Sequence, residues 1–222
     1  MVLLLALDTS TTAITVALHD GSRVRAEATT LDGRGHGEHL APGIARVLED
    51  AGARPADLTD IACGLGPGPF TGLRVGIVTA RTLALVTGAR LHGLCSLDVL
   101  ALQASLEGEV LVATDARRKE VYWAVYARSA TGIPDRLDGP HVGKPADLPP
   151  DVAALPAVGR GPRLYPDAFR SPVDGPLDVS AATLADLILR RLAAGEAVGE
   201  HEPYYLRRPD AAPQVVAKSA LG

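Results

Sequence analysis

Cysteine and aromatic residues are scarce in this sequence, and long hydrophobic runs are missing. Aromatic residues make up 4% of the 222 residues, and the two cysteines, Cys63 and Cys95, do not form a CxxC pair. A disulfide scaffold is therefore excluded, and a reducing, cytoplasmic location is expected. The first apolar run ends at Asp8 with no basic residue before it, and none approaches the roughly 18 residues of a membrane span. Neither a signal peptide nor a membrane association is expected.

A surplus of basic charge is also missing. The 22 basic and 26 acidic residues give a net charge of −4. Basic residues form only short clusters, at Arg117-Arg118-Lys119, Arg190-Arg191 and Arg207-Arg208. A protein that binds nucleic acid alone usually has a basic face, so this balance argues against that class. The hydrophobic share of 47% excludes a disordered chain, and the length fits one large domain or two lobes.

The hydrophobic pattern predicts an α/β fold. Strands are expected at residues 2–7, 13–19, 23–29, 61–65, 90–94, 110–114 and 120–127. Helices are expected at residues 40–51, 71–86, 96–106 and 180–194. The stretch 134–176 holds ten of the 17 prolines and is expected to be irregular, with few long elements.

One internal repeat indicates a duplication. Residues 3–18 (LLLALDTSTTAITVAL) and 110–125 (VLVATDARRKEVYWAV) superpose at a constant offset of 107, which aligns Asp8 with Asp115. Each copy reads as a strand, an acidic turn and a second strand. The repeat predicts two duplicated lobes, at residues 1–106 and 107–222.

Two lobes with an acidic turn in each resemble the actin, sugar-kinase and heat-shock-chaperone ATPase superfamily, in which the two turns face the phosphates of a nucleotide. The segment 63–76 (CGLGPGPFTGLRVG) resembles, more narrowly, the TsaB family of bacterial tRNA threonylcarbamoyladenosine synthesis. Other matching segments are LALDTSTTAITVAL, HLAP at 39–42, CSL at 95–97, DARRKEVYW at 115–123 and EPYYLRRPD at 202–210. The resemblance covers nearly the whole chain and is weakest between about residues 130 and 180.

The resemblance implies two actin-like (ribonuclease-H-like) lobes, each a mixed sheet flanked by helices. It also implies a dimerisation subunit without catalytic residues, cofactor or metal. Such a subunit pairs with a TsaD-like catalytic subunit, is joined by a TsaE-like ATPase, and forms a homodimer when alone. It would meet tRNA only through the complex, which modifies the adenosine 3′ of the anticodon. The alternative is an independent ATPase or small-molecule kinase of the same fold, and a metallopeptidase comes third.

The acidic turns themselves favour the non-catalytic interpretation. Active superfamily members carry glycine in these turns, because the backbone must approach the phosphates. Asp8-Thr9-Ser10 has no glycine beside it, and Asp115 is followed by alanine and two arginines. The turn Gly159-Arg160-Gly161 lies where the resemblance places an adenosine contact, although a plain turn has the same residues. The sequence therefore predicts degenerate nucleotide turns.

Two further motifs are weaker. His36, Glu38 and His39 suggest a metal pair, but they are not an HExxH motif and no third ligand is evident. The glycine-rich loop 66–69 precedes a helix but lacks the Lys-Ser/Thr of a P-loop. It is expected to be a stiff turn between strand and helix.

A stripe of small residues four apart follows that loop, at Gly72, Gly76, Ala80, Ala84 and Gly88. Such a stripe lets another backbone approach closely. The residues alone leave open whether that neighbour is the protein's own sheet or a second chain. The resemblance favours a partner, and implies an interface of Leu40, Ile44, Gly72, Arg74, Gly76 and Ala80.

Overall fold

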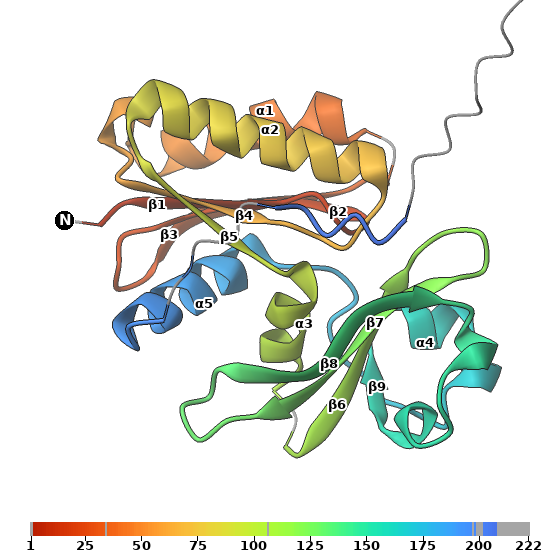
Figure 1. Cartoon of the computed structure of the whole chain (residues 1–222). Coiled ribbons are helices and arrows are strands. Elements are labelled where there is room, and N and C mark those ends of the chain that lie inside the picture. Colours follow the sequence, from red (N-terminus) through yellow and green to blue (C-terminus); the bar gives the residue numbers. More distant parts are fainter. Residues whose placement is uncertain (1, 34, 106, 197, 199–201, 208–222) are drawn as a thin grey trace, which may run out of the picture.

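The computed structural model describes residues 2–33, 35–105, 107–196, 198 and 202–207. In these residues the chain forms two five-stranded sheets, one above the other in Figure 1. The helices lie on the outer faces of the sheets and between them. The expected α/β fold of two lobes is confirmed.

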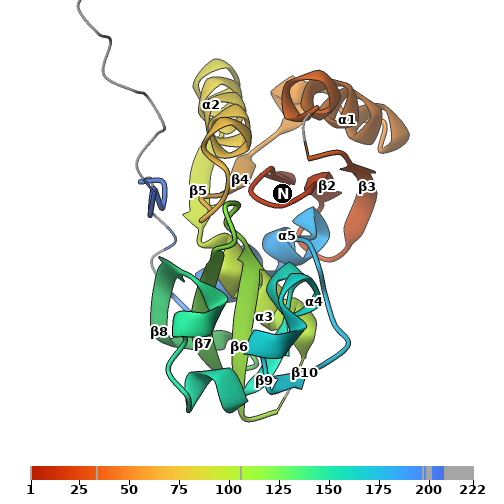
Figure 2. The ribbon, with the colours of Figure 1, turned by 90° about the vertical axis from the view of Figure 1, so that its right-hand side faces the viewer.

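The first sheet has the order β3-β2-β1-β4-β5. Its strands are β1 (Leu4–Asp8), β2 (Ala13–His19), β3 (Val24–Leu31), β4 (Asp60–Gly64) and β5 (Arg90–Leu94). The first three strands are antiparallel, and β4 and β5 run parallel to β1. Helices α1 (His36–Asp50) and α2 (Phe70–Thr87) lie side by side over one face of this sheet (Figure 2).

The second sheet repeats this arrangement with the order β10-β9-β6-β7-β8. Its strands are β6 (Glu109–Asp115), β7 (Val121–Arg128), β8 (Pro134–Gly143), β9 (Pro156–Val158) and β10 (Ser171–Pro172). Helix α3 (Ser96–Ala104) contacts one face, and the short α4 (Arg160–Leu164) packs on β6. Four single turns of 3₁₀ helix lie at Pro55–Asp57, Pro145–Asp147, Val152–Ala154 and Pro166–Ala168.

Helix α5 (Ala181–Ala193) joins the two sheets. It belongs to the second half of the sequence, yet it packs against β1 and β2 of the first sheet (Figure 1). One continuous cluster of buried side chains includes Leu4 of β1, Val112 of β6 and Leu184 of α5. The two halves of the chain therefore share a hydrophobic core, although a boundary near residue 106 separates their strands.

Strand β8 was not expected, since its residues lie in the proline-rich stretch. It is the outermost strand of its sheet and spans ten residues. An edge strand tolerates proline, because one side of its backbone has no neighbouring strand to bond. The pairing of β8 with β7 shifts around Gly139 and Pro140, where a Cβ at position 139 would lie 2.9 Å from the Trp123 carbonyl. The prolines in this stretch are therefore compatible with a strand, because that strand lies at the edge of the sheet.

The small residues of α2 face the interior, which corrects the expected interface. Gly72, Gly76 and Ala80 are buried, and a Cβ at Gly72 would lie 2.8 Å from the Thr9 carbonyl oxygen. Leu40 and Ile44 of α1 are buried in the same part of the core. The neighbour of the stripe is the protein's own β1 and the turn that follows it. Of the expected interface residues, only Arg74 is exposed.

A substitution at Gly76 tests the close contact between α2 and the turn after β1. We expect Gly76→Ala to lower the free energy of unfolding by about 1–3 kcal/mol, because its Cβ would overlap the Thr9 hydroxyl. Urea denaturation measures the change.

The matched control is Gly43→Ala in the middle of α1, where a Cβ would make an ordinary contact with Val16 at 3.6 Å. That variant gains helix propensity and should be up to about 1 kcal/mol more stable. Equal effects of the two substitutions would show that α2 has room at Gly76.

Candidate functional site

The two acidic turns identified in the sequence are the candidate site, and the first of them is closed by its own contacts. Asp8 is fully buried at the end of β1. Its carboxylate accepts hydrogen bonds from the Ser10 backbone N–H (2.8 Å), the Ser10 hydroxyl (2.8 Å) and the Ser96 hydroxyl (2.6 Å). Burial raises the pKa of the Asp8 carboxyl, and these hydrogen bonds oppose the rise. Asp8 thus holds the turn against the start of α3.

Thr9 is engaged by α2. Its hydroxyl donates to the Gly72 carbonyl (2.8 Å) and accepts from the Gly76 backbone N–H (3.1 Å), so it bridges two groups one helical turn apart. A side chain larger than glycine at either position would prevent this approach. The Thr9 hydroxyl is therefore used inside the protein.

The glycine-rich loop covers the remaining side of the first turn. A Cβ at Gly68 would overlap the Ser10 carbonyl, so only glycine fits there. Gly66 has a φ of +84°, donates its N–H to the Ser96 hydroxyl (3.1 Å) and accepts from the Ser96 N–H (2.7 Å). The loop is thus tied to α3 and lies against the turn, as the stiff connection that the sequence predicted.

The second turn is bridged by an ion pair of its own side chains. The Asp115 carboxylate accepts from the Arg117 backbone N–H (2.8 Å) and pairs with the Arg117 guanidinium (3.1 Å). Arg117, Arg118 and Lys119 all have positive φ, between 51° and 62°, which costs a residue with a side chain about 1–2 kcal/mol each. Arg207 offsets part of this cost by donating to the Ala116 carbonyl (2.7 Å) and pairing with Glu120 (2.9 Å). Of the basic pair Arg207-Arg208, Arg208 lies outside the described residues, so only the contacts of Arg207 are given.

Gly159 and Gly161 are required by packing. Gly159 has a φ of +101°, and a Cβ there would overlap the Ala113 carbonyl. A Cβ at Gly161 would lie 2.9 Å from the Ala113 Cβ. Both glycines therefore let α4 begin directly on β6, and this contact accounts for them without a nucleotide.

The space between the two turns is narrow in this structure. A cavity of about 20 Å³ remains there, bordered by the first turn, Asp115, Arg117 and Arg160. Asp178 closes one side, since it accepts from Arg160 Nε (2.9 Å) and from the Thr12 N–H (3.1 Å). A single water needs about 10–15 Å³ by this measure. The two turns face one another across a space of water size.

The histidine motif does not assemble into a metal site. His36 Nε2 lies 3.2 Å from the Thr11 carbonyl, while His39 Nε2 lies 3.3 Å from Asp32 Oδ2. Across the described residues, no three His, Cys, Asp or Glu side chains gather as metal ligands would.

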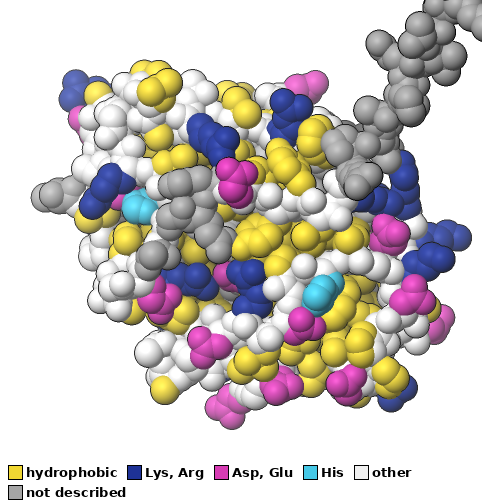
Figure 3. Space-filling model, in the orientation of Figure 1, with side chains coloured by type: hydrophobic (Ala, Val, Ile, Leu, Met, Phe, Trp, Pro, Cys, Tyr) yellow, Lys and Arg dark blue, Asp and Glu magenta, His cyan; other side chains and the backbone are white. Residues whose placement is uncertain are grey.

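Sequence reasoning missed a second feature, the outward face of α2. Phe70, Val78 and Leu85 are 37%, 56% and 85% exposed and lie along one side of the helix. The Arg74 guanidinium lies 5.2 Å from the centre of the Phe70 ring, and the centre of the Tyr205 ring lies 5.3 Å from that of Phe70. Figure 3 shows hydrophobic side chains with basic ones beside them over this helix. The spacing of residues 70, 74, 78 and 85 places them on one side of a helix and could have indicated this face from the sequence.

Three comparisons place the chain among known proteins. The family model for TsaD, tRNA N6-adenosine threonylcarbamoyltransferase, matches residues 28–192. The tRNA threonylcarbamoyladenosine biosynthesis protein TsaB of Escherichia coli is 34% identical over 218 residues, covering 92% of this chain and 94% of that protein. An uncharacterised protein of Mycobacterium tuberculosis is 40% identical over 215 residues, covering 96% and 95%. The solved structure of YeaZ from Pseudomonas aeruginosa has a TM-score of 0.78 and 32% identity, covering 93% of this chain and all of that one.

The buried Asp8 predicts a pH dependence of stability. Its pKa is raised above the ordinary 3.8, so the folded protein holds the proton to higher pH than the unfolded chain does. As the pH rises from about 4 through the folded pKa, ionisation in the buried site lowers the free energy of unfolding. Relative to Asp8→Asn, the wild type should thus lose stability as the pH rises, which urea denaturation at several pH values measures.

Asp57→Asn is a control of opposite sign. Hydrogen bonds from Arg54 lower the pKa of Asp57, so the wild type should gain stability over that variant as the pH rises. A wild type that gains stability over Asp8→Asn with rising pH would contradict the assignment of Asp8.

Proposed function

The chain belongs to the TsaB family of tRNA threonylcarbamoyladenosine biosynthesis proteins, and we propose that within this pathway it is a non-catalytic subunit. Its partner is a TsaD-like catalytic subunit, and a TsaE-like ATPase joins the pair. Alone, the chain forms a homodimer through the surface that binds the TsaD-like subunit, the outward face of α2. The observation that carries this proposal is the closed space between the acidic turns, together with an apolar surface left open on α2.

The closed turns support the absence of catalysis. Thr9 and the Asp8 carboxylate are used in internal hydrogen bonds, and Arg117 takes the place beside Asp115 where an incoming phosphate would need room. Opening a nucleotide site would break these contacts and separate the glycine-rich loop from the Ser10 backbone. The side chains around both turns thus support the closed form.

The outward face of α2 supports the partner interface. Scattered exposed hydrophobic residues are common, but a row that begins at Phe70 and ends at Leu85 follows one helix for its full length. The helix is also long and apolar enough, by length and composition, to cross a membrane. It carries Arg74 and Arg81 near its middle, however, where charge is costly in a bilayer. A protein surface therefore suits this face better than lipid.

The charge of the chain supports binding of tRNA through the complex and not alone. With a net charge of −4 and short basic clusters, the chain can neutralise few phosphates. Within the assembly, the catalytic partner would supply most of the contacts to tRNA. We place this assembly in the cytoplasm, where tRNA is modified.

An independent ATPase or small-molecule kinase is the alternative that the two-lobed fold favours. It requires the 20 Å³ space between the turns to open into a nucleotide site. A peptidase is a further candidate, since another Pseudomonas aeruginosa protein of solved structure is named for its similarity to the peptidase YeaZ. A metallopeptidase would need a ligand set, and the described residues do not bring one together.

The ATPase alternative is tested directly. We expect the purified chain to release no phosphate from ATP above the buffer rate and to leave threonylcarbamoyl-adenylate unconsumed, because both turns are closed. Asp8→Ala and Asp115→Ala should leave that result unchanged. A steady hydrolysis rate that either substitution abolishes would establish the enzyme instead.

The interface is tested on α2. Val78→Asp places a charge in the middle of the exposed row, so it should turn the homodimer into a monomer and prevent capture of the TsaD-like subunit. The melting temperature should stay near that of the wild type, because the side chain is exposed. Size-exclusion chromatography, a pull-down with the purified partner and a melting curve measure the three properties.

Leu164→Asp is the matched control, since Leu164 of α4 is also half-exposed but lies on the second lobe. It should affect neither association. If Val78→Asp still dimerises and captures the partner, α2 is not the interface.

A further inference from the structure

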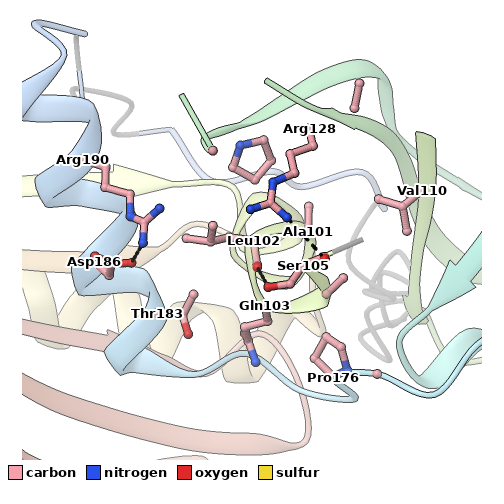
Figure 4. A pocket seen from close by; sticks show the side chains of 15 residues that line it. Ala101, Leu102, Gln103, Ser105, Val110, Arg128, Pro176, Thr183, Asp186 and Arg190 are labelled. Carbon is pink, nitrogen blue, oxygen red and sulfur yellow. Dashed lines mark hydrogen bonds and ion pairs between the residues drawn. The ribbon is translucent and has the colours of Figure 1, made fainter. Parts of the chain in front are cut away.

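A large cavity lies away from the acidic turns. It has a volume of about 600 Å³ and opens where α3, α5 and the beginning of β8 come together (Figure 4). Val110 of β6 lines it, whereas Asp115 ends the same strand, so the cavity and the second turn are separated by about 17 Å of extended chain. None of the roles given above to the turns or to α2 uses this cavity.

One wall of the cavity is apolar and the other is polar. Ala101 and Leu102 of α3 and Val110 of β6 form the apolar side. The polar side comes from β7 and α5 and carries Arg128, Thr183, Asp186 and Arg190 (Figure 4). The volume lies within the range of about 300–1,000 Å³ that is typical of small-molecule sites, and the lining is mainly polar.

The two arginines are weakly held. Among the described residues, the hydrogen bond that Arg128 makes goes to the Ser105 carbonyl and is long, at 3.4 Å. Arg190 pairs with Asp186 one turn earlier on α5 (2.8 Å), with both side chains about half-exposed. A pair of this kind contributes little to stability, so its guanidinium can turn to another acceptor. The two guanidiniums and the single carboxylate leave the cavity with a net positive charge.

We propose that this cavity binds a small anion, a carboxylate or phosphate group on a short organic body. Arg128 and Arg190 would bond the charged group from two sides, since a guanidinium matches either anion with paired N–H donors. The Thr183 hydroxyl, on the same polar side, is a further donor. The apolar side of α3 would contact the body of the ligand.

Binding would act on the joint between the lobes. Arg128 ends β7 of the second sheet, whereas Arg190 belongs to α5, which covers the first sheet. A ligand held by both would connect the two sheets at the end opposite the acidic turns. It should therefore raise the melting temperature as it saturates the site.

Isothermal titration calorimetry on the full chain tests the proposal. The probes are inorganic phosphate, glycerol 3-phosphate and citrate, with sodium chloride at matched ionic strength as the blank. We expect saturable binding of at least one probe at a single site, with the melting temperature rising in parallel. A preference between citrate and the phosphates identifies the anion.

Substitutions locate the binding. Arg128→Gln and Arg190→Gln should each weaken it at least tenfold, and Arg128→Lys should weaken it less, because it keeps the charge but loses the paired donors. Arg46→Gln is the control, since Arg46 makes the same type of pair with Asp50 on α1 and lies far from the cavity. Circular dichroism confirms that each variant is folded.

Two results would overturn the proposal. One is the absence of saturable binding of all three probes up to about 10 mM, a concentration that would fill a site with a Kd of about 1 mM. The other is binding that survives unchanged in the folded double variant R128Q/R190Q, which would place the anion elsewhere on the surface.

Discussion

The close contact between α2 and the turn after β1 determines most of what this protein presents to its surroundings. It depends on two glycines one turn apart, which let the Thr9 hydroxyl bond both the Gly72 carbonyl and the Gly76 N–H. The same contact removes Thr9 from any phosphate and fixes the rotation of the helix. Because the small side of α2 is inside, the row that includes Phe70, Val78 and Leu85 must be outside. Closure of the turn and exposure of this apolar row are thus two consequences of one packing arrangement.

A buried carboxylate holds the two sheets in a fixed relation. Asp98 of α3 accepts from Tyr126 Oη (2.8 Å), from Arg136 Nε (3.0 Å) and Nη2 (3.1 Å), and from Arg191 Nη2 (3.1 Å). These partners come from β7, β8 and α5. Removing one member of such a buried cluster typically costs about 3–5 kcal/mol, because the remaining charge is left without a partner. These side chains thus connect the second sheet to α5, which packs on the first sheet.

The sequence predicted the two-lobed α/β fold, all five strands of the first lobe and the first two strands of the second, because those depend on local hydrophobic pattern. It could not say which side of α2 faces inward, since a stripe of small residues suits close approach to a sheet as well as to a second chain. It also missed β8, because proline content does not distinguish an edge strand from a loop. The contacts of Asp98 join residues up to 93 positions apart, and a local sequence pattern cannot predict such contacts.

The two duplicated turns are closed in physically different ways. In the first lobe, the backbone of the 66–69 loop and the first turns of α2 close on the Asp8 turn, and glycine is required at each contact. In the second lobe, β7 pairs one residue earlier than the repeat implies, since Asp115 lies opposite Val121 whereas Asp8 lies opposite Thr15. The shortened turn forces three side-chain-bearing residues into the left-handed region, where Arg117 covers Asp115. The two closures thus depend on different contacts: close backbone approach at glycines in the first lobe, and an ion pair between side chain and turn in the second.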